Sequence, residues 1–65
     1  MNLTPRELEI LQLLIGGHTN RQIAAAIGIR TTEVIDHIAS LYRQLGAHDR
    51  ESLIASWQRE RAVGQ

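Results

Sequence analysis

Glycines that end helices and residues that begin them alternate along this sequence, and the alternation strongly limits the fold. Gly16 and Gly28 each follow an apolar run, and Gly46 follows Leu45, the last residue of a periodic apolar pattern. Glycine readily adopts the left-handed conformation with which many helices end. Threonine or aspartate stands shortly after each glycine, and both favour the position just before a helix. The chain is therefore predicted to form four helices with short connections, at about residues 5–16, 20–27, 31–45 and 49–62.

Capping boxes support the first two of these helices. Thr4 precedes Pro5, and Glu7 follows three residues after the threonine, which is the order in which two side chains satisfy the free amides of a first turn. Thr19 and Gln22 repeat the same spacing before the second apolar run. Both helix starts are therefore predicted from local sequence.

The third predicted helix has a clear buried side. Val34, Ile38, Leu41 and Leu45 recur at spacings of three and four residues, which places them on one stripe of a helix. The short second helix, a tight turn and this longer helix have the order of a helix-turn-helix. Since no alternation typical of strands occurs, the predicted fold class is all-α, a four-helix bundle that contains a helix-turn-helix and forms a single domain over residues 1–65.

Length and composition exclude several classes of protein. The 65 residues contain no cysteine and no lysine, and seven arginines balance seven acidic residues. Neither a disulfide nor a thiolate metal site can therefore support the small core. The longest apolar stretch, residues 23–27, is far shorter than the roughly 20 residues of a membrane span, and the N-terminus lacks a signal pattern. We expect a cytoplasmic protein without a membrane partner.

The polar residues do not indicate catalysis. His18, His37 and His48 lack the spacing of metal ligands. Glu7 and Glu9 lie two residues apart on a helix and point in different directions, so they do not form an acid/base pair. We therefore predict that the chain is not an enzyme and that it holds no metal, no cofactor and no small-molecule ligand.

The order of four segments carries a family resemblance. LTPRELEILQLL is followed by TNRQIAAAIGI, EVIDH and LYRQLGAHDRESL, and together they resemble, from Leu3 to about Trp57, the C-terminal domain of LuxR, FixJ and GerE type regulators. The resemblance implies a sequence-specific DNA-binding transcription regulator domain, with the second helix across the DNA backbone and the third in the major groove. It also implies a double-stranded DNA partner and a dimer contact on the fourth helix, made with a second copy or with another LuxR-type regulator.

The resemblance and the helix geometry together predict the contacts. Helix N-termini carry unpaired amides and a partial positive charge, so phosphates are expected near Thr19 and Thr31. A turn of about 100° per residue directs one face of the third helix, Ser40 included, away from the buried stripe. The predicted phosphate contacts are Thr19, Asn20, Arg21, Arg30, Thr31, Thr32, His37 and Arg43. The predicted base-facing residues are Ile35, Asp36 and Ala39, and the predicted dimer or partner contacts are Ile54 and Trp57.

The third helix departs from the family pattern at positions that matter for DNA. Glu33 and Ile35 stand where the family has a threonine and a lysine, and Gln44 replaces a second basic residue. Ile35 could meet a thymine methyl group, and Asp36 could accept a hydrogen bond from a cytosine amino group. The rival prediction is an interaction module with impaired DNA binding that pairs with and modulates another regulator.

Three residues each have two interpretations at the level of sequence. Arg30 replaces the family's serine before the third helix, so the cap of that helix either moves to Thr31 or is lost. His37 either contacts a phosphate, as the resemblance implies, or forms a hydrogen bond within the bundle. Trp57 either packs against the first helix or faces a second subunit.

Overall fold

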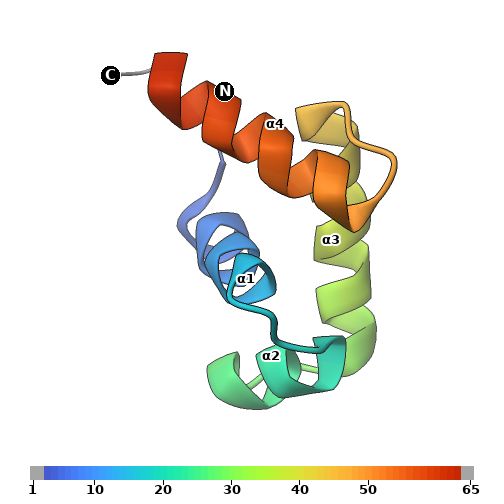
Figure 1. Cartoon of the computed structure of the whole chain (residues 1–65). Helices are drawn as coiled ribbons and strands as arrows, with labels where there is room; N and C mark the ends of the chain where they lie inside the picture. Colours follow the sequence, from blue (N-terminus) through green and yellow to red (C-terminus); the bar gives the residue numbers. More distant parts are fainter. Residues whose placement is uncertain (1–2, 64–65) are drawn as a thin grey trace.

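The computed structural model describes the backbone of residues 3–63 and the side chains of residues 3–60 (Figure 1). This part of the chain consists of α1 (Pro5–Ile15), α2 (Asn20–Ile27), α3 (Thr31–Leu45) and α4 (Arg50–Val63), and no strand occurs in it. The predicted all-helical class and the order of the four helices are confirmed. Every helix end lies within one residue of its predicted position.

The two predicted capping boxes are both present. In α1 the Glu7 amide donates to Thr4 Oγ1 at 3.1 Å, and the Thr4 amide donates to Glu7 Oε1 at 2.9 Å. In α2 the Gln22 amide donates to Thr19 Oγ1 at 3.1 Å, and the Thr19 amide donates to Gln22 Oε1 at 2.9 Å. Local sequence therefore sets where both helices begin.

The starts of α3 and α4 differ from the first two. Arg30 precedes α3 and has no side-chain oxygen, so half of the cap is lost, and only the Arg30 amide is bound, by Glu33 Oε1 at 3.3 Å. Asp49 precedes α4, and its Oδ1 accepts from the Ser52 amide at 2.7 Å, a hydrogen bond that lowers the pKa of Asp49. Because Asp49 is the cap, α4 begins one residue later than predicted.

Glycines end the first three helices. Gly28 and Gly46 have φ angles of 74° and 66° after α2 and α3, in the left-handed region where other residues are strained. Gly16 caps α1, with its amide bonded to Gln12 O at 3.0 Å. Since Gly16 is the cap and lies outside the helix, α1 ends one residue earlier than predicted.

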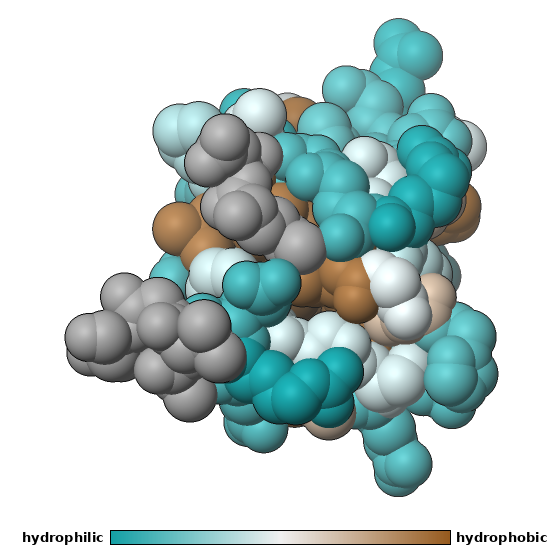
Figure 2. All heavy atoms as spheres, turned by 90° about the horizontal axis from the view of Figure 1, so that it is seen from above, coloured by the Kyte–Doolittle hydropathy of each residue, from teal (hydrophilic) through white to brown (hydrophobic). Residues whose placement is uncertain are grey.

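The core lies between the four helices, and α3 supplies the largest share of it. Val34, Ile38, Leu41 and Leu45 are buried, which confirms the predicted stripe. α3 packs against α1, α2 and α4. The other buried apolar residues are Ile10, Leu11, Leu14, Ile23, Ala24 and Leu53. Seen from above, hydrophobic atoms gather toward the middle of the molecule and hydrophilic side chains surround them (Figure 2).

Two arginines tie helix ends to neighbouring helices. Arg50, the first residue of α4, donates through Nη2 to Leu14 O near the end of α1. Arg6 of α1 donates through Nη1 to Ile27 O at the end of α2, at 3.4 Å. The last carbonyls of a helix lack partners within it, and a cation is favourable there. These two guanidinium groups therefore contribute to packing.

Glu7 links α1 to α3 in addition to capping α1. Its Oε2 accepts from Gln44 Nε2 at 2.7 Å and from Ser40 Oγ at 3.4 Å, and the residue is buried. Ser40, expected on the outward face of the third helix, is half-buried instead, and its hydroxyl bonds to α1. The Glu7 carboxylate accounts for this difference because it offers an acceptor on that side of α3.

The acid dependence of stability should report this contact. The hydrogen bond from the Thr4 amide, with that from Gln44, lowers the pKa of Glu7 below its ordinary value of 4.5, although burial opposes the effect. The ionised carboxylate therefore stabilises the fold above the unfolded-state pKa, and this stabilisation is lost as the pH falls through the lower folded-state pKa. We expect Glu7→Gln to cost about 1 kcal/mol at neutral pH and to flatten the loss of stability in acid, measured by thermal unfolding with circular dichroism.

Glu9→Gln is the matched control for this experiment. Glu9 lies on the same helix, is exposed, and forms a surface ion pair with Arg6 at 3.7 Å, an interaction that contributes little to stability. The control variant should keep the wild-type dependence on acid. If Glu7→Gln kept it too, the role assigned to the Glu7 carboxylate would be wrong.

Candidate nucleic-acid interface

α2, the turn after it and α3 form a helix-turn-helix (Figure 1). In the turn, the amides of Gly28 and Ile29 both donate to Ala24 O, at 2.9 and 3.1 Å. Ile23 and Ala24 are buried, and Ile29 packs against the core. The bundle therefore holds the two helices in a fixed relation, so that α3 is presented from a rigid scaffold.

The N-termini of α2 and α3 leave backbone amides for a ligand. The first backbone bond of α2 runs from the Ile23 amide to Thr19 O at 2.9 Å. The first bond of α3 runs from the Glu33 amide to Arg30 O at 3.0 Å. The amides at the two starts that lack such partners are those of Asn20, Arg21, Thr31 and Thr32. With the partial positive charge of the helix dipole, each start is suited to an anion.

Three arginines of the helix-turn-helix have exposed side chains. Arg21 lies in the first turn of α2, Arg30 precedes α3, and Arg43 lies in the last turn of α3. Within residues 3–60 the ion pairs are Arg6 with Glu9 and His48 with Asp49. None of the three arginines is therefore paired with a carboxylate of the described side chains, and all three are accessible to an anionic partner.

Charge is unevenly distributed between the helix-turn-helix and the rest of the chain. The whole chain is formally neutral, whereas residues 19–45 contain three arginines and two acidic residues, Glu33 and Asp36. Glu33 accepts a hydrogen bond from the Arg30 amide, and Asp36 is exposed on α3. The helix-turn-helix thus has a small excess of positive charge, which sits at its helix ends.

The outward face of α3 is apolar and acidic. Ile35 is 49% exposed, and Asp36 and Ala39 beside it are exposed as well. Arg43 is exposed further along the helix, and His37 is half-buried. The three predicted base-facing residues are therefore accessible on one side of α3.

A hollow of about 400 Å³ opens beside this face. It is lined by Leu14, Asn20, Ile35, Ile38, Ala39, Tyr42 and Arg50, and we call it the α3 hollow. Tyr42 and Arg50 were not among the predicted site residues. Tyr42 follows Ile35 by seven residues, which is two helical turns on the same face, so the sequence contained that signal. Arg50 belongs to α4, and it reaches the hollow through its hydrogen bond to Leu14 O at the end of α1.

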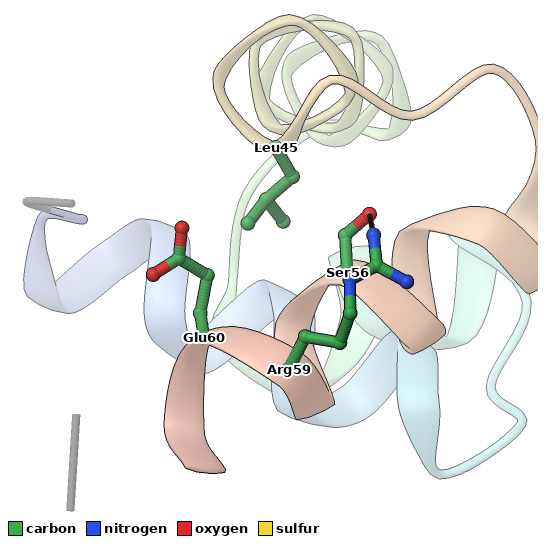
Figure 3. Close-up of a pocket in the computed structure, with 4 residues that line it drawn as sticks. All are labelled: Leu45, Ser56, Arg59 and Glu60. Carbon is green, nitrogen blue, oxygen red and sulfur yellow. Dashed lines mark hydrogen bonds between the residues drawn. The ribbon is translucent and has the colours of Figure 1, made fainter. Parts of the chain in front are cut away.

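A second hollow, of about 300 Å³, lies between the end of α3 and the outer half of α4 (Figure 3). Its walls are Leu45, Ser56, Arg59 and Glu60. Arg59 Nη2 donates to Ser56 Oγ at 3.1 Å, so the guanidinium is partly occupied within α4. None of the predicted DNA contacts lines this hollow.

α4 has both a core side and an accessible side. Leu53 is fully buried. Trp57 is half-buried and packs against the core, and Ile54 is half-buried too. The main packing partner of α4 is α3 rather than α1. Trp57 therefore combines a core contact with surface that stays accessible to a second molecule.

The described part of the chain holds neither a group of metal-ligating side chains nor a membrane-spanning helix. Among residues 3–60, no three His, Asp or Glu side chains come together in a group that could hold a metal ion. No helix of residues 3–63 has the length and apolar character to cross a membrane.

The sequence matches the family described as "Bacterial regulatory proteins, luxR family" (GerE) over residues 1–56. The chain belongs to this luxR family. The resemblance predicted from the four segments is thus confirmed. Domains of this family bind DNA, act in transcription regulation and are not enzymes. The luxR domain described here contains its helix-turn-helix at α2 and α3.

Two relatives support the family and the fold. The HTH-type transcriptional regulator MalT of Yersinia enterocolitica is 37% identical over 57 residues, which are 88% of this chain and 6% of that protein. The crystal structure of response regulator ChrA, from a heme-sensing two-component system, matches 94% of this chain with a TM-score of 0.88 and 38% identity. This luxR domain covers 30% of the ChrA chain, so it spans only a small part of both relatives.

Proposed function

We propose that the domain recognises a specific DNA sequence by placing α3 in the major groove, with α2 across the DNA backbone. The observation that carries the proposal is the combination, in one helix-turn-helix, of two anion-binding helix starts and three exposed arginines that lack carboxylate partners among the described side chains. DNA phosphates are bound by cationic side chains and by the free amides of helix starts. Membership of the luxR family supports DNA as the partner.

Phosphates bind at the two helix starts and along α3. The amides of Asn20 and Arg21 receive one phosphate, and the Arg21 guanidinium adds a charge-assisted hydrogen bond. Thr19 Oγ1 already accepts from Gln22, and its hydroxyl hydrogen is free to donate to the same phosphate. The proposed phosphate contacts are Thr19, Asn20, Arg21, Arg30, Thr31, Thr32, His37 and Arg43.

Base edges face Ile35, Asp36 and Ala39 in this arrangement. Phosphate contacts position a protein on DNA, whereas base contacts give it sequence specificity. An apolar side chain suits a thymine methyl group, and the Asp36 carboxylate can accept from a cytosine amino group. The exposed side of α3 therefore selects bases by shape and by an acceptor, without a basic side chain at Ile35.

Two copies are proposed to bind DNA together through α4. Ile54 and Trp57 are only half-buried in one copy, so they offer apolar surface to a partner. A two-fold dimer would set the two α3 helices about 34–36 Å apart, one turn of DNA, as a palindromic site requires. The partner is a second copy or another LuxR-type regulator, and the site of action is the cytoplasm.

Fluorescence anisotropy with a pool of random-sequence duplexes tests the proposal. We expect binding at low salt that weakens moderately as salt rises, because three arginine contacts give a slope of about −3 in log affinity against log salt. A duplex selected from the pool should bind more tightly than the pool itself. Absence of binding at low salt would overturn the proposal and favour the rival interaction module, which pairs with another regulator through Ile54 and Trp57 of α4.

A further inference from the structure

Ile35 is an unusual side chain for a face that meets DNA. Ile35 is 49% exposed, whereas the other large apolar side chains of residues 3–60 are buried or half-buried. A single exposed apolar residue is ordinary on a protein surface. Ile35, however, is not isolated, because it forms a wall of the α3 hollow together with Ile38 and Ala39.

The α3 hollow is lined by apolar side chains and by two polar ones. Leu14, Ile38 and Tyr42 continue the apolar wall, while Asn20 and Arg50 stand at the first positions of α2 and α4. Arg50 Nη2 is bound to Leu14 O, but a guanidinium has five N–H donors, so others remain. The residues that line the hollow include no carboxylate. The hollow therefore suits an apolar group carried on a polyanion.

Thymine supplies such a group. In the major groove it presents a 5-methyl group, whereas cytosine, adenine and guanine carry no methyl group there. Ile35 and Ala39 are four residues apart, which is about 6 Å along the helix axis. Successive bases on one strand are about 3.4 Å apart, so the two side chains span about two base steps.

We propose that the α3 hollow is the receptor for the 5-methyl groups of thymines, and that the preferred DNA site holds two thymines within two base steps at this position. The inference rests on the proposed DNA-binding function and names the sequence feature that function selects. Ile35 and Ala39 make the methyl contacts. Asn20, whose amide is one of the proposed phosphate contacts, borders the hollow, and Arg50 keeps that border positively charged.

Replacing thymine with uracil in the duplex tests the inference, because the two bases differ only by the 5-methyl group. The tightest duplex selected from the random pool is resynthesised with uracil at each thymine in turn and at pairs of thymines. We expect uracil at either of the two thymines that face Ile35 and Ala39 to weaken binding about fourfold, which is the effect of losing one buried methyl group. Uracil at the other thymines should change nothing.

Two variants assign the effect to the hollow. Ile35→Ala should bind the original duplex more weakly and lose the discrimination between thymine and uracil at its position, as a double-mutant cycle measures. Its salt slope should match that of wild type, because Ile35 contacts no phosphate. Ile35→Lys should also lose the discrimination, and its salt slope should be steeper by about one unit.

The outcomes separate this inference from the proposed function. Salt-dependent, sequence-specific binding that is indifferent to uracil at every thymine would overturn the thymine receptor and leave DNA binding intact. A full uracil effect in Ile35→Ala would overturn it as well. Failure to bind any duplex at low salt would instead overturn the proposed function on which the inference rests.

Discussion

Replacing Leu41 with alanine is expected to lower the free energy of unfolding by about 2 to 5 kcal/mol, the usual range for a leucine removed from a packed core. Leu41 is fully buried in α3, the helix that packs against all three others. A cavity there weakens the packing of α3 in the core that the four helices share. A domain of 65 residues has only about 3 to 10 kcal/mol of stability in total, so the variant should be close to unfolding. Urea unfolding followed by circular dichroism measures the loss.

Ile35→Ala is the control for this experiment. Ile35 lies on the same helix and loses a comparable aliphatic group, but it is half exposed. Its unfolding free energy should change by no more than about 0.5 kcal/mol. Equal losses in the two variants, or a wild-type urea midpoint in Leu41→Ala, would mean that α3 does not organise the core. The same control establishes that Ile35→Ala is folded when its DNA binding is measured.

The helices could be predicted because their signals are local. Thr4 with Glu7, and Thr19 with Gln22, determine two helix starts through side chains three residues away. The stripe from Val34 to Leu45 follows from spacing alone. Short-range patterns of this kind do not depend on how the helices pack, so the structure agrees with them.

The contacts between helices could not be predicted in this way. Glu7 meets Gln44 across 37 positions of sequence, and Arg50 meets Leu14 across 36. Each contact depends on the crossing of helices, which periodicity does not encode. Glu7 was fully explained by its capping box in the sequence, so nothing suggested a second partner.

The candidate site likewise has a part that the sequence predicts and a part that depends on how the helices pack. Exposure of Ile35, Asp36 and Ala39 follows from the turn of one helix, and it was predicted. The α3 hollow is built from four helices, so only the structure reveals that Ile35 belongs to a concave apolar surface. Arg50 enters that surface through the docking of α4.

A chain without net charge is unusual for a DNA-binding protein, but the positions of the charges reduce that objection. Glu7 is buried against α3, and Asp49 caps α4. Glu9 pairs with Arg6 on the surface of α1. These carboxylates lie outside the helix-turn-helix segment, whose arginines stay exposed. The low net charge still implies that few phosphates are neutralised, so salt dependence should be moderate and measurable.

Replacing both Arg21 and Arg43 with alanine is expected to weaken binding to the selected duplex about a hundredfold, since hydrogen bonds to charged groups contribute about 1.5 kcal/mol or more each. The slope of log affinity against log salt should fall by roughly two units, one for each phosphate contact. Anisotropy across a salt series measures both. The preference for thymine over uracil should persist, because the base-facing residues are unchanged.

The Arg59→Ala variant distinguishes direct arginine–phosphate contact from long-range electrostatic attraction. Arg59 is exposed on α4 and bonds to Ser56, so its loss removes the same charge without touching the helix-turn-helix. If long-range attraction alone mattered, Arg59→Ala would weaken binding as much as Arg21→Ala or Arg43→Ala alone. If the contacts are direct, the salt slope of Arg59→Ala stays at the wild-type value. An unchanged salt slope in the double variant would mean that Arg21 and Arg43 do not contact the DNA phosphates. The phosphates would then be left to Arg30 and the helix amides, a set too small for the slope of about −3 that three arginine contacts predict.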